Sequence, residues 1–187
     1  RAGVLQREHE LDVTLHRRHR ALDVSIRITF AQFVGSGNRL VPIERSEATD
    51  ALLRDVCELR GLRWLALNGT NITDSGLEAV VDLPRLERLW LSHTPIGDSG
   101  MEYVSQMPGL RQLFLDATEV TDAGLARLAT LPRLQLLSLI YLPVTDAGVR
   151  RLRALSNMQS LMLDSTRISD DGLSHLSGLK DLETLSL

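Results

Sequence analysis

A block of 24 residues recurs along most of this chain and limits what the chain can fold into. From Leu62 onward, successive blocks read LRWLALNGTNITDSGLEAVVDLPR, LERLWLSHTPIGDSGMEYVSQMPG, LRQLFLDATEVTDAGLARLATLPR, LQLLSLIYLPVTDAGVRRLRALSN and MQSLMLDSTRISDDGLSHLSGLKD. A sixth block opens with Leu182, Leu185 and Leu187 and is cut off there. A unit this short cannot bury its own apolar face, so neighbouring copies must stack into an elongated array.

Each copy changes its hydrophobic period half-way. In the first half apolar residues alternate around Leu65 and Leu67, which predicts a short strand with one buried face. In the second half Leu77, Val80 and Leu83 lie three apart, which predicts a short helix with one apolar stripe. Stacked copies therefore predict an α/β fold, with a parallel sheet on one side and short helices on the other.

A T-D-x-G, G-D-x-G or S-D-x-G motif stands between the two halves. Its Thr, Ser or Asp oxygen is expected to accept a hydrogen bond from the first free N–H groups of the helix, and a following proline is expected to end the helix. The aspartates also raise the alternative of a calcium ladder, which we disfavour because the glycine-rich nonapeptide of calcium-binding β-rolls is missing. These aspartates are Asp74, Asp98, Asp122, Asp146 and Asp170.

The chain divides into three predicted parts. Residues 38–61 are a degenerate first repeat, since Val41 and Ile43 fall one period before Leu65 and Leu67. Residues 1–37 do not keep the period, and their alternating apolar residues predict a β-rich N-terminal cap over the first strand edge. Residues 62–187 hold five full repeats and the strand of a truncated sixth. We expect further repeats or domains in a longer parent chain, with an exposed end at Leu173, Leu176 and Leu179.

The pattern L-x-x-L-x-L-x-x-T-x-I-T-D-x-G-L-x-x-L-x-x-L-P resembles the leucine-rich repeat of bacterial repeat proteins, and it is similar to the cysteine-containing repeats of F-box receptors. The resemblance covers residues 62–187 and implies a right-handed horseshoe, with the sheet concave and the helices convex. The family usually has Asn or Cys at the ninth position of the repeat. Leu142 occupies it in the fourth copy, which puts the local hydrogen-bond ladder there in doubt; the other copies have Thr70, Thr94, Thr118 and Thr166.

Composition and motifs exclude several classes of function. The net charge of −3 has the wrong sign for general nucleic-acid binding, and no apolar stretch is long enough to insert into a membrane. The only cysteine, Cys57, cannot form an internal disulfide or a multi-cysteine zinc site, and it is expected to be a packed thiol rather than a nucleophile. Nucleophile-elbow, zinc-protease, P-loop and dinucleotide motifs are absent, so we expect no enzyme, no cofactor and no metal.

The third, fifth, seventh and eighth positions of the repeat are expected to face away from the core on the sheet side. Four of the seven aromatic residues occur there, although solvation alone would favour small polar side chains. Apolar patches with a polar rim usually mark contact surfaces. The alternative is that the N-terminal segment or a missing part of the parent covers this face. The candidate partner-binding residues are Trp64, Arg88, Trp90, His93, Phe114, Asp116, Leu136, Ile140, Tyr141, Met162 and Asp164.

The function predicted from the sequence is a non-enzymatic recognition module that binds a protein or peptide on its concave sheet. The resemblance implies this class, and the exposed aromatic residues support it independently. The alternative is a structural or substrate-receptor segment of a larger multidomain protein, such as a bacterial envelope protein or an F-box-like adaptor. The compartment stays open, with the lack of disulfides favouring the cytoplasm over a bacterial envelope or surface.

Overall fold

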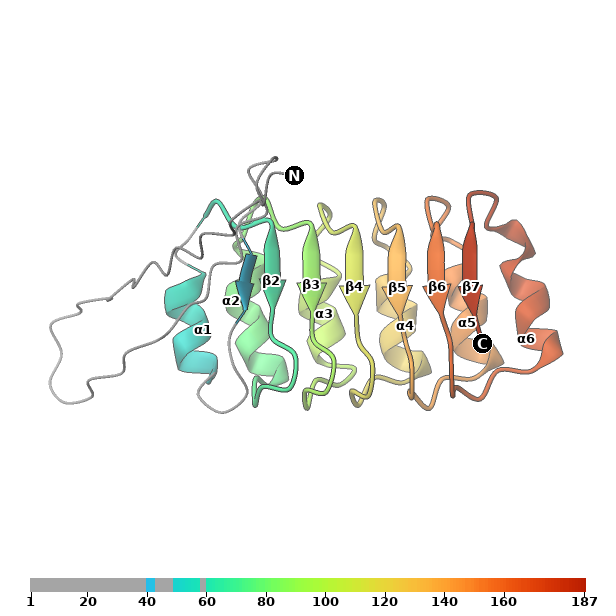
Figure 1. Cartoon of the computed structure of the whole chain (residues 1–187), viewed down its shortest axis with the longest axis horizontal. Coiled ribbons are helices and arrows are strands. Elements are labelled where there is room, and N and C mark those ends of the chain that lie inside the picture. The colour runs from blue at the N-terminus through green and yellow to red at the C-terminus, as the bar shows by residue number, and fades with distance from the viewer. Residues whose placement is uncertain (1–39, 43–48, 58–59) are drawn as a thin grey trace, which may run out of the picture.

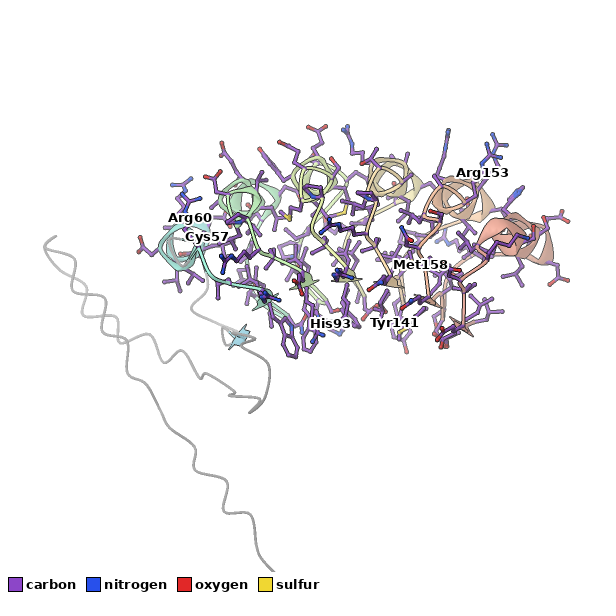
Figure 2. The ribbon with its side chains drawn as sticks, turned by 90° about the horizontal axis from the view of Figure 1, so that it is seen from above. Cys57, Arg60, His93, Tyr141, Arg153 and Met158 are labelled. Carbon is purple, nitrogen blue, oxygen red and sulfur yellow. The ribbon has the colours of Figure 1, made fainter. Side chains whose placement is uncertain are left out.

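The computed structural model of the protein describes residues 40–42, 49–57 and 60–187. Its strands form one parallel sheet in chain order, and its helices pack side by side on the opposite side of that sheet (Figure 1). Seen from above, the array is a shallow arc with the strands on its inner side (Figure 2). These features confirm the predicted α/β solenoid. The cap expected for residues 1–37 lies outside the described residues.

The sheet repeats with the period of the sequence. Each strand residue pairs with the residue 24 positions later, as Leu40 with Trp64 and Leu65 with Leu89. The strands are β1 (Leu40–Pro42), β2 (Trp64–Ala66), β3 (Arg88–Trp90), β4 (Gln112–Phe114), β5 (Leu136–Ser138), β6 (Ser160–Met162) and β7 (Thr184–Ser186). The α-helices are α1 (Asp50–Val56), α2 (Leu77–Val81), α3 (Gly100–Val104), α4 (Asp122–Leu128), α5 (Asp146–Leu152) and α6 (Asp170–Ser174), with 3-10 turns η1 (Asp74–Gly76) and η2 (His175–Gly178).

The core runs along the whole array between sheet and helices. Each complete turn contributes the same apolar positions, and in the first of them Leu65, Leu67, Ile72, Leu77 and Val80 are all fully buried. Each buried aliphatic side chain contributes about 1.5–3 kcal/mol relative to an exposed one. Stacking therefore stabilises the chain without cross-links.

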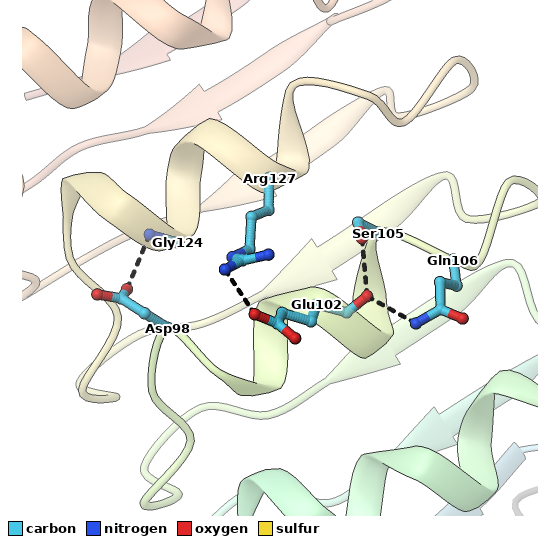
Figure 3. A network of polar contacts seen from close by, with 6 residues as sticks. All are labelled: Asp98, Glu102, Ser105, Gln106, Gly124 and Arg127. Carbon is cyan, nitrogen blue, oxygen red and sulfur yellow. Dashed lines mark hydrogen bonds and ion pairs between the residues drawn. The ribbon is translucent and has the colours of Figure 1, made fainter.

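The aspartates of the T-D-x-G motif bind the following turn of the solenoid, and not their own helix as expected. The Asp98 carboxylate accepts hydrogen bonds from the amide of Thr121 (2.8 Å), from its hydroxyl (2.6 Å) and from the Gly124 amide at the start of α4 (2.9 Å; Figure 3). The threonines do cap their own helices, since Thr121 and Thr145 accept from amides two residues on. Asp74, Asp122 and Asp146 likewise accept hydrogen bonds from the following turn, so four aspartates of the motif link neighbouring turns.

Two carboxylates that bind the following turn have a lowered pKa: Asp50 of the degenerate first repeat and Asp146 of the motif. Burial raises the pKa of Asp50, but hydrogen bonds from Thr73 and Ser75 outweigh burial and lower it overall. The pKa of Asp146 is lowered by hydrogen bonds from the hydroxyl and amide of Ser169. These donors stabilise the charged form, so the carboxylates need no metal ion to neutralise them. In the part of the chain that the structure describes, no group of three metal-ligating residues occurs.

The glycine of the motif makes room for the carboxylate of the preceding turn. A β carbon on Gly124 would lie 2.5 Å from Asp98 Oδ1, which is far inside van der Waals contact. Gly100 meets Asp74 in the same way one turn earlier. Close approach of a neighbouring side chain therefore explains why glycine stands inside these helices, where it is otherwise unfavourable.

The helices end before the prolines that were expected to stop them. α4 ends at Leu128, several residues before Pro132, and α5 ends at the equivalent Leu152 although no proline follows. The prediction is wrong, since α5 ends at the same position of the repeat without any proline. Proline only occupies the turn beyond.

The far end of the array is better covered than the sequence suggested. Leu176 and Leu179 are only 5% and 6% exposed, because η2 folds them onto the core, while Leu173 is half-buried against it. The expectation of exposed leucines there is therefore wrong for Leu176 and Leu179. The exposed apolar residues are instead Leu185 and Leu187 of the last strand and its end.

The ninth position of the repeat carries a buried hydroxyl that closes the turn after the strand. Thr70, Thr94 and Thr118 are buried, and each donates to the carbonyl three residues earlier, at 2.7, 2.6 and 2.7 Å. Leu142 cannot donate, yet its amide still reaches the Leu139 carbonyl at 3.3 Å and its side chain joins the core. The ladder of the fourth copy is intact, so the doubt raised by the sequence was unfounded.

Replacing Leu142 with threonine should change the free energy of unfolding by no more than about 1 kcal/mol, because a regained hydrogen bond offsets lost apolar contact. Leu142→Ala regains no bond and should cost about 2–4 kcal/mol. Urea unfolding of both variants measures the difference. Equal losses would show that the threonine hydroxyl contributes nothing at this position.

Candidate binding surface

The outward side chains of the strands form what we call the strand-side surface, running from Trp64 on β2 to Met162 on β6. Alternation of buried and half-buried residues along β3, β4 and β6 agrees with the period-two pattern of the sequence. Leu89 and Leu113 point into the core and are fully buried, while Trp90 and Phe114 beside them are half-buried. Because only one face of the sheet packs on the core, the side chains of the other face are free to form this surface.

Aromatic rings form a continuous row over β2, β3 and β4. The ring centroids of Trp64 and Trp90 lie 4.7 Å apart, and those of Trp90 and Phe114 lie 5.3 Å apart, both pairs edge to face. The Arg88 guanidinium lies 5.2 Å from the centre of the Trp64 ring, within the range of a cation–π interaction. These contacts hold the three rings in fixed positions relative to one another. We refer to Trp64, Trp90 and Phe114 as the aromatic row.

The indole N–H groups of the aromatic row are an unusual feature of this surface. Trp64 Nε1 and Trp90 Nε1 are both shielded from solvent and find no acceptor among the described residues. A buried donor without an acceptor costs about 1–3 kcal/mol. Packing of the rings against each other therefore outweighs the loss of two hydrogen bonds to water.

The third residue after the strand end has a left-handed backbone in every complete turn. The φ angle is positive at Gly69 (67°), His93 (60°), Ala117 (51°), Tyr141 (61°) and Ser165 (57°), and the amide of each of the first four donates to a carbonyl of the next turn. Sequence reasoning placed His93 and Tyr141 on this rim but missed their backbone conformation. The glycine at Gly69 was the only available signal.

Tyr141 stands out on this rim because it is bulky, strained and exposed. A left-handed conformation costs a residue other than glycine about 1–2 kcal/mol. The Tyr141 side chain is 67% exposed and lies on the strand side of the molecule, as does His93 (Figure 2). Neither burial nor backbone preference explains a tyrosine at this position.

Asp116, predicted as part of the polar rim, is bound by neighbouring turns. Its carboxylate accepts from the hydroxyl of Ser92 (3.1 Å), from the hydroxyl of Ser138 and from the amide of Ile140 (3.0 Å). Ser138 lies between Phe114 and Met162 in the sheet register and is fully buried, although the sequence expected it to face outward. Two larger neighbours cover the small side chain. Asp116 therefore fixes the shape of the surface.

The remaining predicted residues lie on the later turns. Leu136, Ile140, Met162 and Asp164 are all half-buried, the first and third on β5 and β6 and the others just after those strands. The predicted residues thus occupy five successive turns, with the aromatic row on the first three and Leu136, Ile140, Tyr141 and Met162 on the last two. Apolar side chains and charged groups, among them Arg88 and Asp116, both contribute to this surface.

Cys57 lies on the opposite, helical side, beside a pocket of about 400 Å³. Burial raises the pKa of its thiol to about 12, and the nearby Asp82 carboxylate adds to this rise while Arg60 opposes it. Only the thiolate is nucleophilic, so this thiol is unreactive at neutral pH. The pocket is lined by Arg54, Cys57, Arg60, Glu78, Ala79 and Asp82.

None of the helices described is long and apolar enough to span a lipid bilayer.

Comparison with known proteins agrees with the repeat and the fold. A family model described as a leucine-rich repeat matches residues 62–81 and 84–105. No curated protein matches the chain. Part of the chain thus matches the leucine-rich repeat, and the solved structures below share its fold. The similarity to F-box receptor repeats stays a prediction.

Three solved structures of bacterial proteins share the fold. A leucine-rich-repeat protein of Leptospira interrogans is 25% identical with a TM-score of 0.54, over 70% of this chain and 33% of that one. An internalin of Listeria monocytogenes is 23% identical with a TM-score of 0.56, over 78% and 46%. Internalin C2 of the same organism is 22% identical with a TM-score of 0.56, over 79% and 80%. The chain thus spans less than half of the first two proteins.

Proposed function

We propose that this chain is a non-enzymatic recognition module that binds a protein or peptide partner on its strand-side surface. The leucine-rich-repeat fold supports a protein-interaction module. The observation that carries the proposal is Tyr141, an aromatic side chain 67% exposed to solvent on a backbone conformation that disfavours it. Local strain at an exposed bulky residue is a mark of functional sites.

The aromatic row supplies the second argument. Tryptophan and tyrosine are enriched among residues that dominate binding energy, because they bury a large area with few rotatable bonds. Here the edge-to-face contacts of Trp90 with Trp64 and Phe114 already hold those rings in place. Binding of a partner would therefore cost little conformational entropy in the side chains of this surface.

The Tyr141→Gly variant should bind its partner more weakly and yet be more stable. Removal of the side chain relieves the left-handed strain, so we expect the free energy of unfolding to rise by about 0.5–1 kcal/mol. Loss of an exposed aromatic anchor should weaken binding about tenfold or more. Binding is measured by capturing partner proteins from a lysate on the immobilised chain and quantifying them by mass spectrometry. Stability is measured by urea unfolding.

Ala117→Gly is the matched control, since Ala117 has the same conformation one turn earlier (φ 51°) but little side chain to contact a partner. It should gain similar stability and keep full capture. Equal capture by Tyr141→Gly and Ala117→Gly would contradict a binding role for the tyrosine.

A further inference from the structure

Three arginines of α5 form a concentrated positive charge on the helical side of the solenoid. Arg150 and Arg151 lie in the last turn of the helix and Arg153 is its C-cap residue. All three are exposed, and Arg153 projects from the side opposite His93 and Tyr141 (Figure 2). We call these three residues the arginine patch.

The neighbouring helices do not neutralise the arginine patch. The positions one repeat away from Arg150 are Ala126 on α4 and Ser174 on α6, and those beside Arg153 are Ala129 and Ser177. These side chains are small and uncharged. Among the described residues, no carboxylate lies within 4.0 Å of an arginine of the patch, and none of its guanidinium groups donates a hydrogen bond.

In the preceding turn, by contrast, an arginine of the helical side forms an ion pair with a carboxylate. Arg127 on α4 lies one repeat before Arg151, and its guanidinium meets Glu102 on α3 at 2.5 Å (Figure 3). A single cation in the last turn is enough to complement a helix dipole, as in α1 and α4, whereas α5 carries three like charges within four residues.

We infer that the arginine patch is a second docking surface, which binds an acidic segment of a partner protein. Guanidinium groups bind carboxylates through paired, planar hydrogen bonds. The inference concerns the side of the molecule opposite the strand-side surface and does not depend on the function proposed for that surface.

Charge on the rest of the helical side favours a polypeptide over a lipid surface. Exposed carboxylates of Glu78 and Asp171 stand on α2 and α6, on the two sides of the patch. An extended anionic bilayer would meet these carboxylates and be repelled. An acidic segment no wider than one helix can lie over the end of α5 and meet the three arginines. The net charge of −3 likewise disfavours nucleic acid as the occupant.

The test uses a fluorescent oligo-glutamate peptide and the whole chain, with anisotropy measured at low and at high salt. The triple variant Arg150→Gln, Arg151→Gln and Arg153→Gln should bind the peptide at least about tenfold more weakly than the wild type, and wild-type affinity should fall as salt rises. Glutamine and arginine have similar helix propensities, so the variant should melt cooperatively, which circular dichroism checks.

The matched control removes the same charge from three separated turns, with Arg85→Gln, Arg133→Gln and Arg167→Gln, and should keep the wild-type affinity within about threefold. Equal weakening of both triple variants would show a net-charge effect and overturn the inference. Failure of the wild type to bind the peptide would overturn it as well. So would binding to phosphatidylserine vesicles that depends on the arginine patch, since the occupant would then be a lipid surface.

Discussion

The Gly124→Ala variant is expected to lose about 2–4 kcal/mol of the free energy of unfolding. Alanine normally stabilises a helix relative to glycine by about 1 kcal/mol, so the sign of the effect is reversed here. The added methyl group would lie 2.5 Å from Asp98 Oδ1 and 2.9 Å from the side chain of Val120. Relief of this clash must displace the carboxylate that binds Thr121 and Gly124 across the two turns.

Gly178→Ala is the control for this prediction, because a β carbon at Gly178 meets no atom within 4 Å. It should change stability by less than about 0.5–1 kcal/mol. Urea unfolding curves of both variants and the wild type provide the comparison. If Gly124→Ala proves as stable as the wild type, the aspartate bonds between turns contribute little and stacking rests on apolar burial alone.

The repeat predicts the fold because stacking gives each residue the same environment in every turn. The positions of Leu65 and Leu77 in the repeat are occupied by apolar residues in every turn. The spacing of apolar residues around each position therefore distinguishes the strand from the helix. The period-two pattern also predicts which strand residues face outward, as the half-buried Trp90 and Phe114 show. The use of these residues for binding stays a proposal.

Contacts between turns could not be predicted from the sequence in the same way. The carboxylate of Asp98 could reach the N–H groups of its own helix or those of the next one, and a perfect repeat contains both options with the same spacing. The left-handed position was hidden because His93, Ala117 and Tyr141 occupy it as well as Gly69. Backbone geometry at such positions depends on hydrogen bonds to the neighbouring turn.

The largest expected effect on function comes from replacing Trp90 and Phe114 together with serine. Each aromatic anchor at the centre of an interface contributes about 2 kcal/mol or more, so the double variant should bind at least about a hundredfold more weakly. The fold should survive, because both rings are half-buried on the outer face of the sheet. Loss of their edge-to-face contacts should cost about 1–2 kcal/mol of stability.

Tyr103→Ser is the matched control on the helical side. Tyr103 lies on α3, half-buried against the core, so the variant loses aromatic contacts away from the strand-side surface. We expect Tyr103→Ser to lose about as much stability as the double variant and to bind the partner as tightly as the wild type does. If the double variant fails to fold, Tyr141→Gly tests the same surface, because that variant is expected to be more stable than the wild type.

The most direct measurement is a calorimetric titration of a purified, captured partner into the wild type, the Trp90→Ser and Phe114→Ser double variant, and Tyr103→Ser, each first shown to melt cooperatively. Binding on the strand-side surface predicts a dissociation constant at least about a hundredfold higher for the double variant and within about threefold of the wild type for Tyr103→Ser. A folded double variant that binds the partner as tightly as the wild type would contradict the proposed function.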